Sequence, residues 1–243
     1  MNLVEHDPTF SAIVLTGSGP YFSSGADLST GAFVPEPNGR RTRNKPAGRF
    51  MRSILRFPKI FAAAVNGPAV GIAVTLLMHC DLVHCSDTAT FWAPFTRLAL
   101  VPELCSSVTF IESHGLSKAN ELLLLGKKID AHTAMDWNIC SKVVNTPSTQ
   151  DGIDPFNINS LASKMCTEID KKLLALPLGE RTAAYFVSFL KGARRERMEQ
   201  VCFAELNKLD ERFDSGQVQE ASRYVKIGSS SKNTKQLHLH SKL

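Results

Sequence analysis

A single carboxylate among apolar residues is the strongest candidate for acid–base chemistry in this sequence. Glu103 lies in the segment 98–108 (LALVPELCSSV), between Pro102 and Leu104. Apolar surroundings disfavour the charged form of a carboxyl group, which raises its pKa and suits it to carrying protons near neutral pH. The sequence also allows a simpler interpretation, an exposed glutamate in the first turn of a helix, stabilised by the helix dipole.

Two glycine-rich segments could present backbone N–H groups to a developing negative charge. The first, 17–27 (GSGPYFSSGAD), lacks the Gly-Lys-Ser/Thr of a P-loop and the glycine spacing of a dinucleotide-binding fingerprint. The second, 66–73 (NGPAVGIA), leaves a predicted strand and opens a predicted helix, where free N–H groups converge. A flexible turn and ordinary helix capping are the simpler interpretations of the two segments.

Alternating strand and helix patterns must position these segments. The hydrophobic patterns predict strands at 11–16, 60–65, 81–85, 90–92 and 142–144. They predict helices at 48–57, 69–79, 107–114, 118–125, 131–138 and 158–176, and three helical segments from 179 to about 226. Asp130 is the expected N-cap of the helix at 131–138. This order predicts an α/β fold with a helical C-terminal region.

Composition narrows the class of protein further. The chain has 243 residues, of which 43% are hydrophobic, enough for one domain, or one domain and a small appendage, with a substantial core. With 28 Lys and Arg against 23 Asp and Glu, the net charge of +5 is too small to indicate nucleic-acid binding by itself. The six cysteines are scattered, mostly within apolar runs, and are interpreted as reduced thiols of an intracellular protein.

Two features could suggest a membrane span or a metal site, and we expect neither. Residues 60–80 are nearly all apolar, but Asn66-Gly67-Pro68 divides them into a strand and a helix that are each too short to span a bilayer. The pairs His79-Cys80 and His84-Cys85 match no standard zinc spacing.

The three segments together, in this order, resemble the crotonase superfamily, with the likeness strongest over residues 11–144. The resemblance implies an α/β ββα spiral core with a helical C-terminal trimerisation region, and an acyl-CoA thioester substrate. It implies that two backbone N–H groups hold the thioester oxygen as an enolate forms. By position these donors are Ala26 and Ile72. Substrate-binding residues are then expected around them, at Ser24, Gly25, Asp27, Leu28 and Gly71.

Within this superfamily, the resemblance favours the peroxisomal Δ3,Δ2-enoyl-CoA isomerases. Enoyl-CoA hydratases use two glutamates, and the matching positions hold Thr75 and Phe95 here. The isomerases use one glutamate in a Pro-Glu-Gly-Cys-Ser-Ser-like stretch, which 102–107 (PELCSS) matches with Leu104 in place of the glycine. Glu103 is then the catalytic proton shuttle, Trp92, Phe95 and Leu104 are expected pocket walls, and no water, metal or cofactor takes part.

Two rival functions remain open at the level of sequence. One is another crotonase-type enzyme, such as an enoyl-CoA hydratase or a dienoyl-CoA isomerase. The other is a non-catalytic acyl-CoA-binding or assembly subunit. It arises because family members carry a strand pair and a helix before the strand at 11–16, so the N-terminal part of the core is expected to be truncated.

The C-terminal part of the chain bears on the cellular location and the oligomeric state of the protein. The tripeptide Ser241-Lys242-Leu243 is the type read by the peroxisomal import receptor, which places the protein in the peroxisomal matrix. The expected organisation is a core over 1–176, a helical region over 177–228 and a flexible tail over 229–243. The resemblance implies a homotrimer or higher oligomer. The helical region carries a basic run of Lys191, Arg194, Arg195 and Arg197, and the loop 40–43 is rich in arginine. These side chains are either phosphate contacts for CoA or part of a solvated surface.

Overall fold

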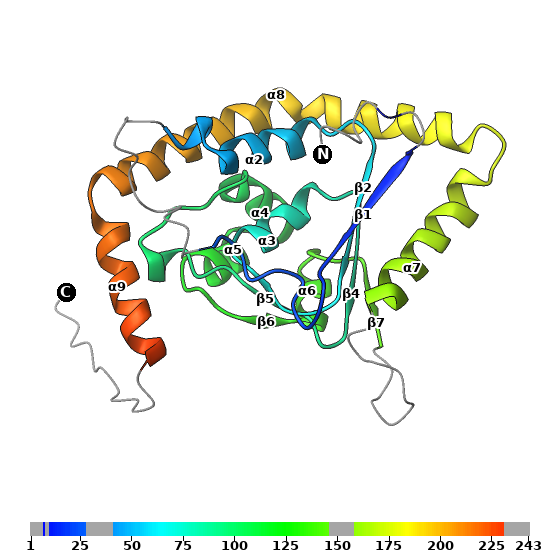
Figure 1. Cartoon of the computed structure of the whole chain (residues 1–243). Helices are drawn as coiled ribbons and strands as arrows, with labels where there is room; N and C mark the ends of the chain where they lie inside the picture. The colour runs from blue at the N-terminus through cyan, green and yellow to red at the C-terminus, as the bar shows by residue number, and fades with distance from the viewer. Residues whose placement is uncertain (1–6, 8–9, 28–40, 146–157, 231–243) are drawn as a thin grey trace.

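A four-stranded parallel sheet forms one side of the molecule. The computed structural model describes residues 7, 10–27, 41–145 and 158–230. The strands of this sheet are β1 (Ala12–Thr16), β2 (Ile60–Val65), β4 (Leu82–Ser86) and β7 (Lys142–Val144), in the order β1-β2-β4-β7 (Figure 1). In register, Val14 lies opposite Ala62, and Cys85 lies opposite Val143. Because parallel strands end at the same edge, the segments that leave β1 and β2 begin side by side.

A smaller sheet continues from that edge. It contains β3 (Ala69–Val70), β5 (Thr90–Trp92) and β6 (Ile129–Asp130), with β3 parallel and β6 antiparallel to β5. An isolated bridge joins Ser23 to Ala69, so the segment after β1 also contacts this sheet. The turn at 66–68 therefore carries the chain from one sheet to the other.

Helices cover the sheets and extend away from them. Their bounds are α2 (Pro46–Arg56), α3 (Ile72–Thr75), α4 (Ser106–His114), α5 (Leu116–Leu123), α6 (Ala131–Asp136), α7 (Ile158–Ile169), α8 (Gly179–Asp214) and α9 (Gln217–Ser230). Short 3-10 segments lie at Thr42–Asn44, Leu76–His79 and Thr96–Leu98, and a π-helical segment follows α7 at Asp170–Leu174. Asp130 caps α6 as predicted, since its side chain accepts the backbone N–H of Thr133.

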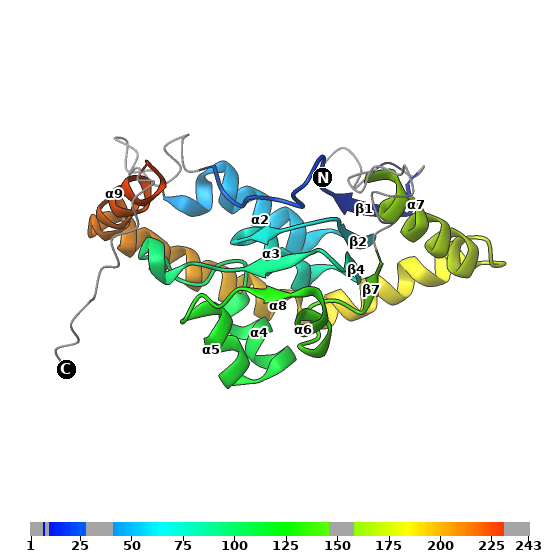
Figure 2. The ribbon, with the colours of Figure 1, turned by 90° about the horizontal axis from the view of Figure 1, so that it is seen from below.

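Both faces of β2 are buried, which is why its sequence is an uninterrupted apolar run. Phe61, Ala63 and Val65 face the main core. Ala62 and Ala64 face α7, which covers the outer side of the sheet (Figures 1 and 2). Two alanines on this side let the helix approach the sheet closely.

The long helix α8 brings the C-terminal region to the core. It has 36 residues, a length of about 54 Å at 1.5 Å per residue, and it runs along α2 across the molecule (Figures 1 and 2). Its second half buries Met198, Cys202, Leu206 and Leu209. The carboxylate of Glu205 lies on the same buried face.

The strand β6 was not predicted, and several elements begin or end one or two residues from their predicted bounds. Beyond this, three predicted elements differ from the structure. The predicted helix at 69–79 is instead β3, a turn at Gly71, α3 and a 3-10 segment, because Ala69 and Val70 pair with β5. The predicted helix at 158–176 changes to π-helical geometry after Ile169. The three helical segments predicted from 179 onward are two, since α8 runs without a break to Asp214. Packing and strand pairing, which involve distant residues, decide all three.

No helix in the described part of the chain is both long and apolar enough to cross a membrane.

Candidate functional site

A cavity of about 310 Å³ lies where several segments leave their strands. Residues 24–26 follow β1, and residues 70–72 comprise the last residue of β3 and the two residues after it. Trp92 is the last residue of β5, and Phe95 follows that strand. Its described lining is Ser24, Gly25, Ala26, Val70, Gly71, Ile72, Trp92, Pro94, Phe95, Arg97, Leu98, Leu100, Val101, Glu103 and Leu209. The carboxyl ends of strands are the usual ligand-binding edge of an open α/β sheet.

Asn66 ties the two glycine-rich segments together. Its side-chain oxygen accepts the backbone N–H of Gly17 at 2.9 Å, and its amide group donates to the carbonyl oxygen of Gly19 at 2.9 Å. Both ends of one side chain are therefore used to hold the start of the first segment against the second.

Ala26 and Ile72, the predicted donors, line the same cavity. Among the described residues, neither backbone N–H has a hydrogen-bond partner. Gly71 places Ile72, because its own N–H donates to the carbonyl oxygen of Trp92 at 2.8 Å and its φ of 60° is left-handed. The helix that Ile72 begins has only four residues, so the predicted contribution of a helix dipole is small.

Gly25 allows the first segment to approach the second. Its φ is +87°, and a Cβ atom there would lie 2.8 Å from the carbonyl oxygen of Val70. A residue with a side chain would push Ala26 away from Ile72.

Glu103 reaches this cavity from the turn before α4. Burial, and then the negative charge of Glu205, raise the pKa of Glu103 to about 7. The geometry therefore favours the proton-carrier interpretation over an exposed glutamate on a helix. Of the described lining residues, Glu103 is the one carboxylate, and Arg97 is the one other charged side chain.

Three predicted substrate-binding residues are not placed on this cavity. Leu104 is fully buried in the core rather than forming a pocket wall, because the chain turns inward after Glu103. The φ of Leu104 is 54°, a left-handed value that glycine adopts with less strain. Leucine therefore replaces the glycine of the Pro-Glu-Gly-Cys-Ser-Ser-like stretch at a position where the backbone favours glycine. Asp27 is exposed and is absent from the described lining, and Leu28 lies outside the described residues.

Sequence reasoning missed Arg97, Leu209 and Glu205. Arg97 lies over the ring of Trp92, with its guanidinium carbon 5.4 Å from the ring centre. Leu209 and Glu205 come from α8, more than 100 residues after Glu103. One signal was available for Glu205: with Asp210, it is one of two carboxylates on a helix face that is otherwise mainly apolar.

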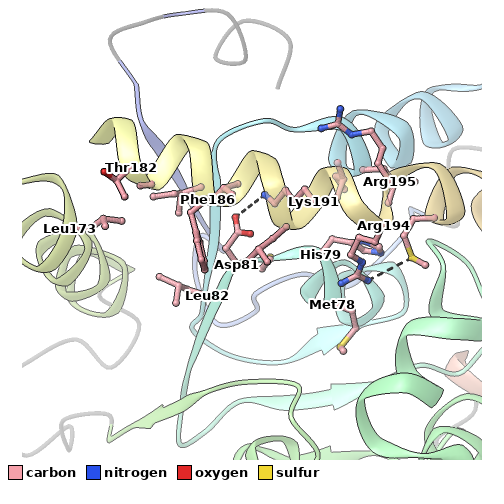
Figure 3. A pocket seen from close by; sticks show the side chains of 18 residues that line it. Met78, His79, Asp81, Leu82, Leu173, Thr182, Phe186, Lys191, Arg194 and Arg195 are labelled. Carbon is pink, nitrogen blue, oxygen red and sulfur yellow. Dashed lines mark hydrogen bonds and ion pairs between the residues drawn. The ribbon is translucent and has the colours of Figure 1, made fainter. Parts of the chain in front are cut away.

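A second and larger cavity, about 540 Å³, lies between α8 and the residues around His79 (Figure 3). Its walls are mainly apolar, and Lys191 pairs with Asp81 at 2.7 Å. Burial lowers the pKa of His79 to about 4 and raises the pKa of the Cys80 thiol. Glu103 and the two unpartnered N–H groups meet in the smaller cavity, which is therefore the candidate site.

Several of the basic residues considered as phosphate contacts are paired within the chain. Arg197 pairs with Glu112 at 2.6 Å, and Arg41 with Asp214 at 2.6 Å. Arg194 and Arg195 line the larger cavity. In the part of the chain that the structure describes, no three His, Cys, Asp or Glu side chains gather as a metal-binding group.

Comparison with known proteins identifies relatives that match between about half and four fifths of the chain. Enoyl-CoA delta isomerase 2 of Rattus norvegicus is 46% identical over 134 residues, which are 54% of this chain and 34% of that protein. Enoyl-CoA delta isomerase 3, peroxisomal, of Mus musculus is 42% identical over 134 residues, which are 54% of this chain and 42% of that protein. Chromodomain Y-like protein 2 of Mus musculus is 31% identical over 193 residues, 78% of this chain and 36% of that protein. The chain thus spans between a third and a half of the length of these relatives.

Solved structures share the fold over nearly the whole chain. Pseudomonas aeruginosa OdaA superimposes with a TM-score of 0.78 and 29% identity, over 96% of this chain and 85% of that chain. An enoyl-CoA hydratase/isomerase of Pseudoalteromonas atlantica gives a TM-score of 0.78 and 26% identity, over 93% of this chain and 83% of that one. The sequence profile described as Enoyl-CoA hydratase/isomerase matches residues 1–153. The chain therefore belongs to the enoyl-CoA hydratase/isomerase family and has the crotonase fold that its sequence predicted.

Proposed function

We propose that this chain converts 3-enoyl-CoA to trans-2-enoyl-CoA, with Glu103 as the proton shuttle. The observation that carries the proposal is one carboxyl group with a pKa of about 7, on the same cavity as two unpartnered backbone N–H groups. In this reaction the ionised Glu103 takes a proton from C2, and the double bond moves from C3–C4 to C2–C3. The protonated carboxyl then returns the proton to C4, so the site ends as it began.

The N–H groups of Ala26 and Ile72 would act on the charge that develops between the two proton transfers. Removal of the C2 proton leaves a dienolate, whose negative charge collects on the thioester oxygen. Donors aimed at that oxygen stabilise the transition state more than the ground state, typically by about 3–4 kcal/mol for each donor. Their backbone origin fixes their direction before the substrate binds.

Hydration of a double bond is less well supported. Thr75, at one position where hydratases carry a glutamate, is buried, and its hydroxyl donates to the carbonyl oxygen of Ile72 at 3.1 Å. Phe95, at the other position, adds an apolar wall to the cavity. With Glu103 as the one carboxylate of the described lining, a second acid–base group to activate water is missing there.

The decisive experiment measures formation of the 2-enoyl product from a 3-enoyl-CoA by wild type, Glu103→Gln and Glu112→Gln. Glu112 is an exposed residue of α4 and serves as a matched control for the loss of one carboxylate. We expect Glu103→Gln to lose about 10²–10⁴-fold or more in kcat, and Glu112→Gln to retain wild-type activity. A folded wild type that binds acyl-CoA without converting it would contradict the proposal and support the non-catalytic alternative.

We also propose that the reaction needs no cofactor. It moves a proton and a double bond without any net oxidation or reduction. Activity should therefore survive dialysis against a chelator and removal of small molecules by gel filtration. Loss of activity that an added metal ion restores would overturn this part of the proposal.

We further propose that the chain assembles as a homotrimer or a higher oligomer. The first half of α8 leaves four large apolar side chains exposed, which favours a protein–protein contact there. These side chains are Tyr185, Phe186, Phe189 and Leu190. Native mass spectrometry should give a multiple of three chains, and Phe189→Glu should shift the population towards monomer. A wild type that stays monomeric at micromolar concentration would refute this.

Peroxisomal localisation is proposed on two grounds. One relative is named as peroxisomal, and Ser241-Lys242-Leu243 is the tripeptide that the import receptor reads at a free C-terminus. Imaging of the chain with an N-terminal fluorescent tag, with and without these three residues, tests the proposal. Import that does not depend on the tripeptide would contradict it.

A further inference from the structure

A buried carboxylate on α8 holds the turn that follows Glu103. Glu205 is only 7% exposed. It accepts the backbone N–H of Cys105 at 2.6 Å and the backbone N–H of Ser107 at 2.9 Å, and it also accepts the Ser107 hydroxyl at 2.6 Å. Three donors from one turn therefore satisfy a charge that would otherwise be costly to bury.

This turn has a strained backbone. Leu104 has a φ of 54° and Cys105 a φ of 63°, so two adjacent residues with side chains are both left-handed. Each costs on the order of 1–2 kcal/mol relative to the right-handed conformation. Such a conformation persists only where surrounding groups enforce it, and hydrogen bonds to a carboxylate are among the stronger ones available.

The conformation of the turn decides where Glu103 points. Glu103 immediately precedes the two left-handed residues, and its carbonyl oxygen accepts the N–H of Ser106 at 3.2 Å. If the turn relaxed, the direction of the Glu103 side chain into the cavity would change. Glu205 does not line the cavity, so its influence passes through the turn and through space.

Glu205 also acts on Glu103 electrostatically. Its negative charge is the second cause, after burial, that raises the pKa of Glu103. The other charged or titratable groups near this region include Arg97 on the cavity wall, Arg194, whose positive charge acts on Cys105, and His79 on the 3-10 segment Leu76–His79. The thiols of Cys105 and Cys202 also lie here, and their hydrogen bond, and then burial, raise the pKa of Cys105. Burial raises the pKa of Glu205 as well, while its hydrogen bonds from the turn lower it. Burial keeps His79 neutral near pH 7, because its pKa is lowered to about 4.

We propose that Glu205 is a positioning residue for Glu103: its carboxylate holds the left-handed turn that directs Glu103 into the cavity, and it places a second negative charge behind that residue. The proposal rests on the proposed role of Glu103 as proton shuttle. In this proposal Glu205, a residue of α8 far from Glu103 in the sequence, affects the reaction without contacting the substrate.

The test compares Glu205→Gln with Glu196→Gln, a matched change at an exposed position of the same helix. Glutamine retains the shape and one accepting oxygen but removes the charge. We expect kcat/KM to fall about 10- to 100-fold in Glu205→Gln, as for other small misplacements of a catalytic group, and to stay near wild type in Glu196→Gln. Carboxyl carbon NMR of labelled glutamate should show Glu103 titrating at lower pH in Glu205→Gln than in the control.

The titration separates positioning from a merely structural role. A loss of activity without the shift in the Glu103 titration would reduce Glu205 to a structural residue and overturn the proposal. An unchanged activity would overturn it as well. If the wild type has no isomerase activity but the titration of Glu103 still shifts, the proposed function fails while the link between the two carboxylates stands.

A milder variant covers the case in which Glu205→Gln does not fold. Glu205→Asp keeps the charge but shortens the side chain by one methylene, so it cannot hold all three donors of the turn at their present distances. We expect kcat to fall while KM changes little, because Glu205 does not line the cavity. A Glu205→Asp variant with the kcat of the wild type would refute the proposal.

Discussion

A single hydrogen bond joins His79, on the wall of the larger cavity, to Leu104, the residue that follows Glu103. Nε2 of His79 lies 2.8 Å from the backbone carbonyl oxygen of Leu104. A carbonyl oxygen only accepts, so Nε2 carries the proton. Because burial lowers the pKa of His79 to about 4, the ring is neutral at pH 7 and its Nδ1 is unprotonated. A residue of the larger cavity therefore supports the chain immediately after Glu103.

His79 should make the fold sensitive to acid. Its pKa is about 4 in the folded chain and about 6.5 in the unfolded chain, so between these values the unfolded chain binds more protons. Stability from this group is therefore lost as the pH falls from about 6.5 to 4. His79→Gln, which keeps a donor for Leu104, should show a smaller decrease in Tm between pH 7 and pH 5 than wild type. His132→Gln, an exposed change on α6, is the control, and an equal decrease in all three proteins would contradict the prediction.

Glu103 should act on stability in the opposite direction. Its folded pKa of about 7 lies above its unfolded value of about 4.5, so the folded chain binds more protons between them. Stability from this group is lost as the pH rises from about 4.5 through 7. We expect the Tm of Glu103→Gln to exceed that of wild type by a few degrees at pH 8 and by less at pH 5. A difference that is constant with pH would indicate that burial does not raise this pKa.

Gly25 and Gly19 offer a matched pair for testing the approach of the first segment to the second. Both have left-handed φ angles, +87° and +86°. An added Cβ would lie 2.8 Å from the Val70 carbonyl oxygen at Gly25, whereas it would meet no atom within 4 Å at Gly19. Gly19→Ala should therefore lose about 1 kcal/mol of stability for its left-handed φ alone. Gly25→Ala should lose more, because the clash with the Val70 carbonyl oxygen adds to the cost of its φ, and only this variant should also lose isomerase activity. Equal activities would show that the position of Ala26 is not critical.

At Leu104, substitution by glycine should destabilise the protein no more than substitution by alanine, the reverse of the usual order. Both substitutions remove a fully buried side chain and should destabilise the protein by about 2–5 kcal/mol. At most sites glycine is the worse of the two by about 0.5–1 kcal/mol, but the φ of 54° here favours glycine. Leu104→Gly should therefore unfold at a urea concentration equal to or higher than Leu104→Ala. Because Leu104 does not line the cavity, neither variant should change the preference for acyl-chain length.

The local sequence was sufficient to predict the elements whose signals are local. The apolar run of β2 indicated a strand at 60–65, and the structure has those bounds. The predicted cap at Asp130 is also confirmed, because its partner is three residues away. The prediction of a single helix over 69–79 was wrong for the opposite reason. Its first two residues belong to a sheet whose other strands come later in the chain.

For the site, the apolar neighbours of Glu103 left it open between a proton carrier and an exposed glutamate, and the resemblance indicated Glu103, Ala26 and Ile72. That the three line one cavity was decided by the parallel order of β1 and β2 and by the hydrogen bonds of Asn66. Leu104 looked like a pocket wall because it is adjacent to Glu103, but two left-handed residues turn it into the core.

The role of Glu205 could not be predicted from the local sequence. Its carboxylate is separated from Ser107 by 98 residues, yet it holds the turn at Glu103. Residue types and spacing determined which chemistry the chain can offer, because chemical groups and short-range conformational preferences are properties of the local sequence. Only the tertiary structure decided which groups meet, and burial with a neighbouring charge then determined the pKa of about 7 at Glu103. Both effects depend on contacts between residues far apart in the chain.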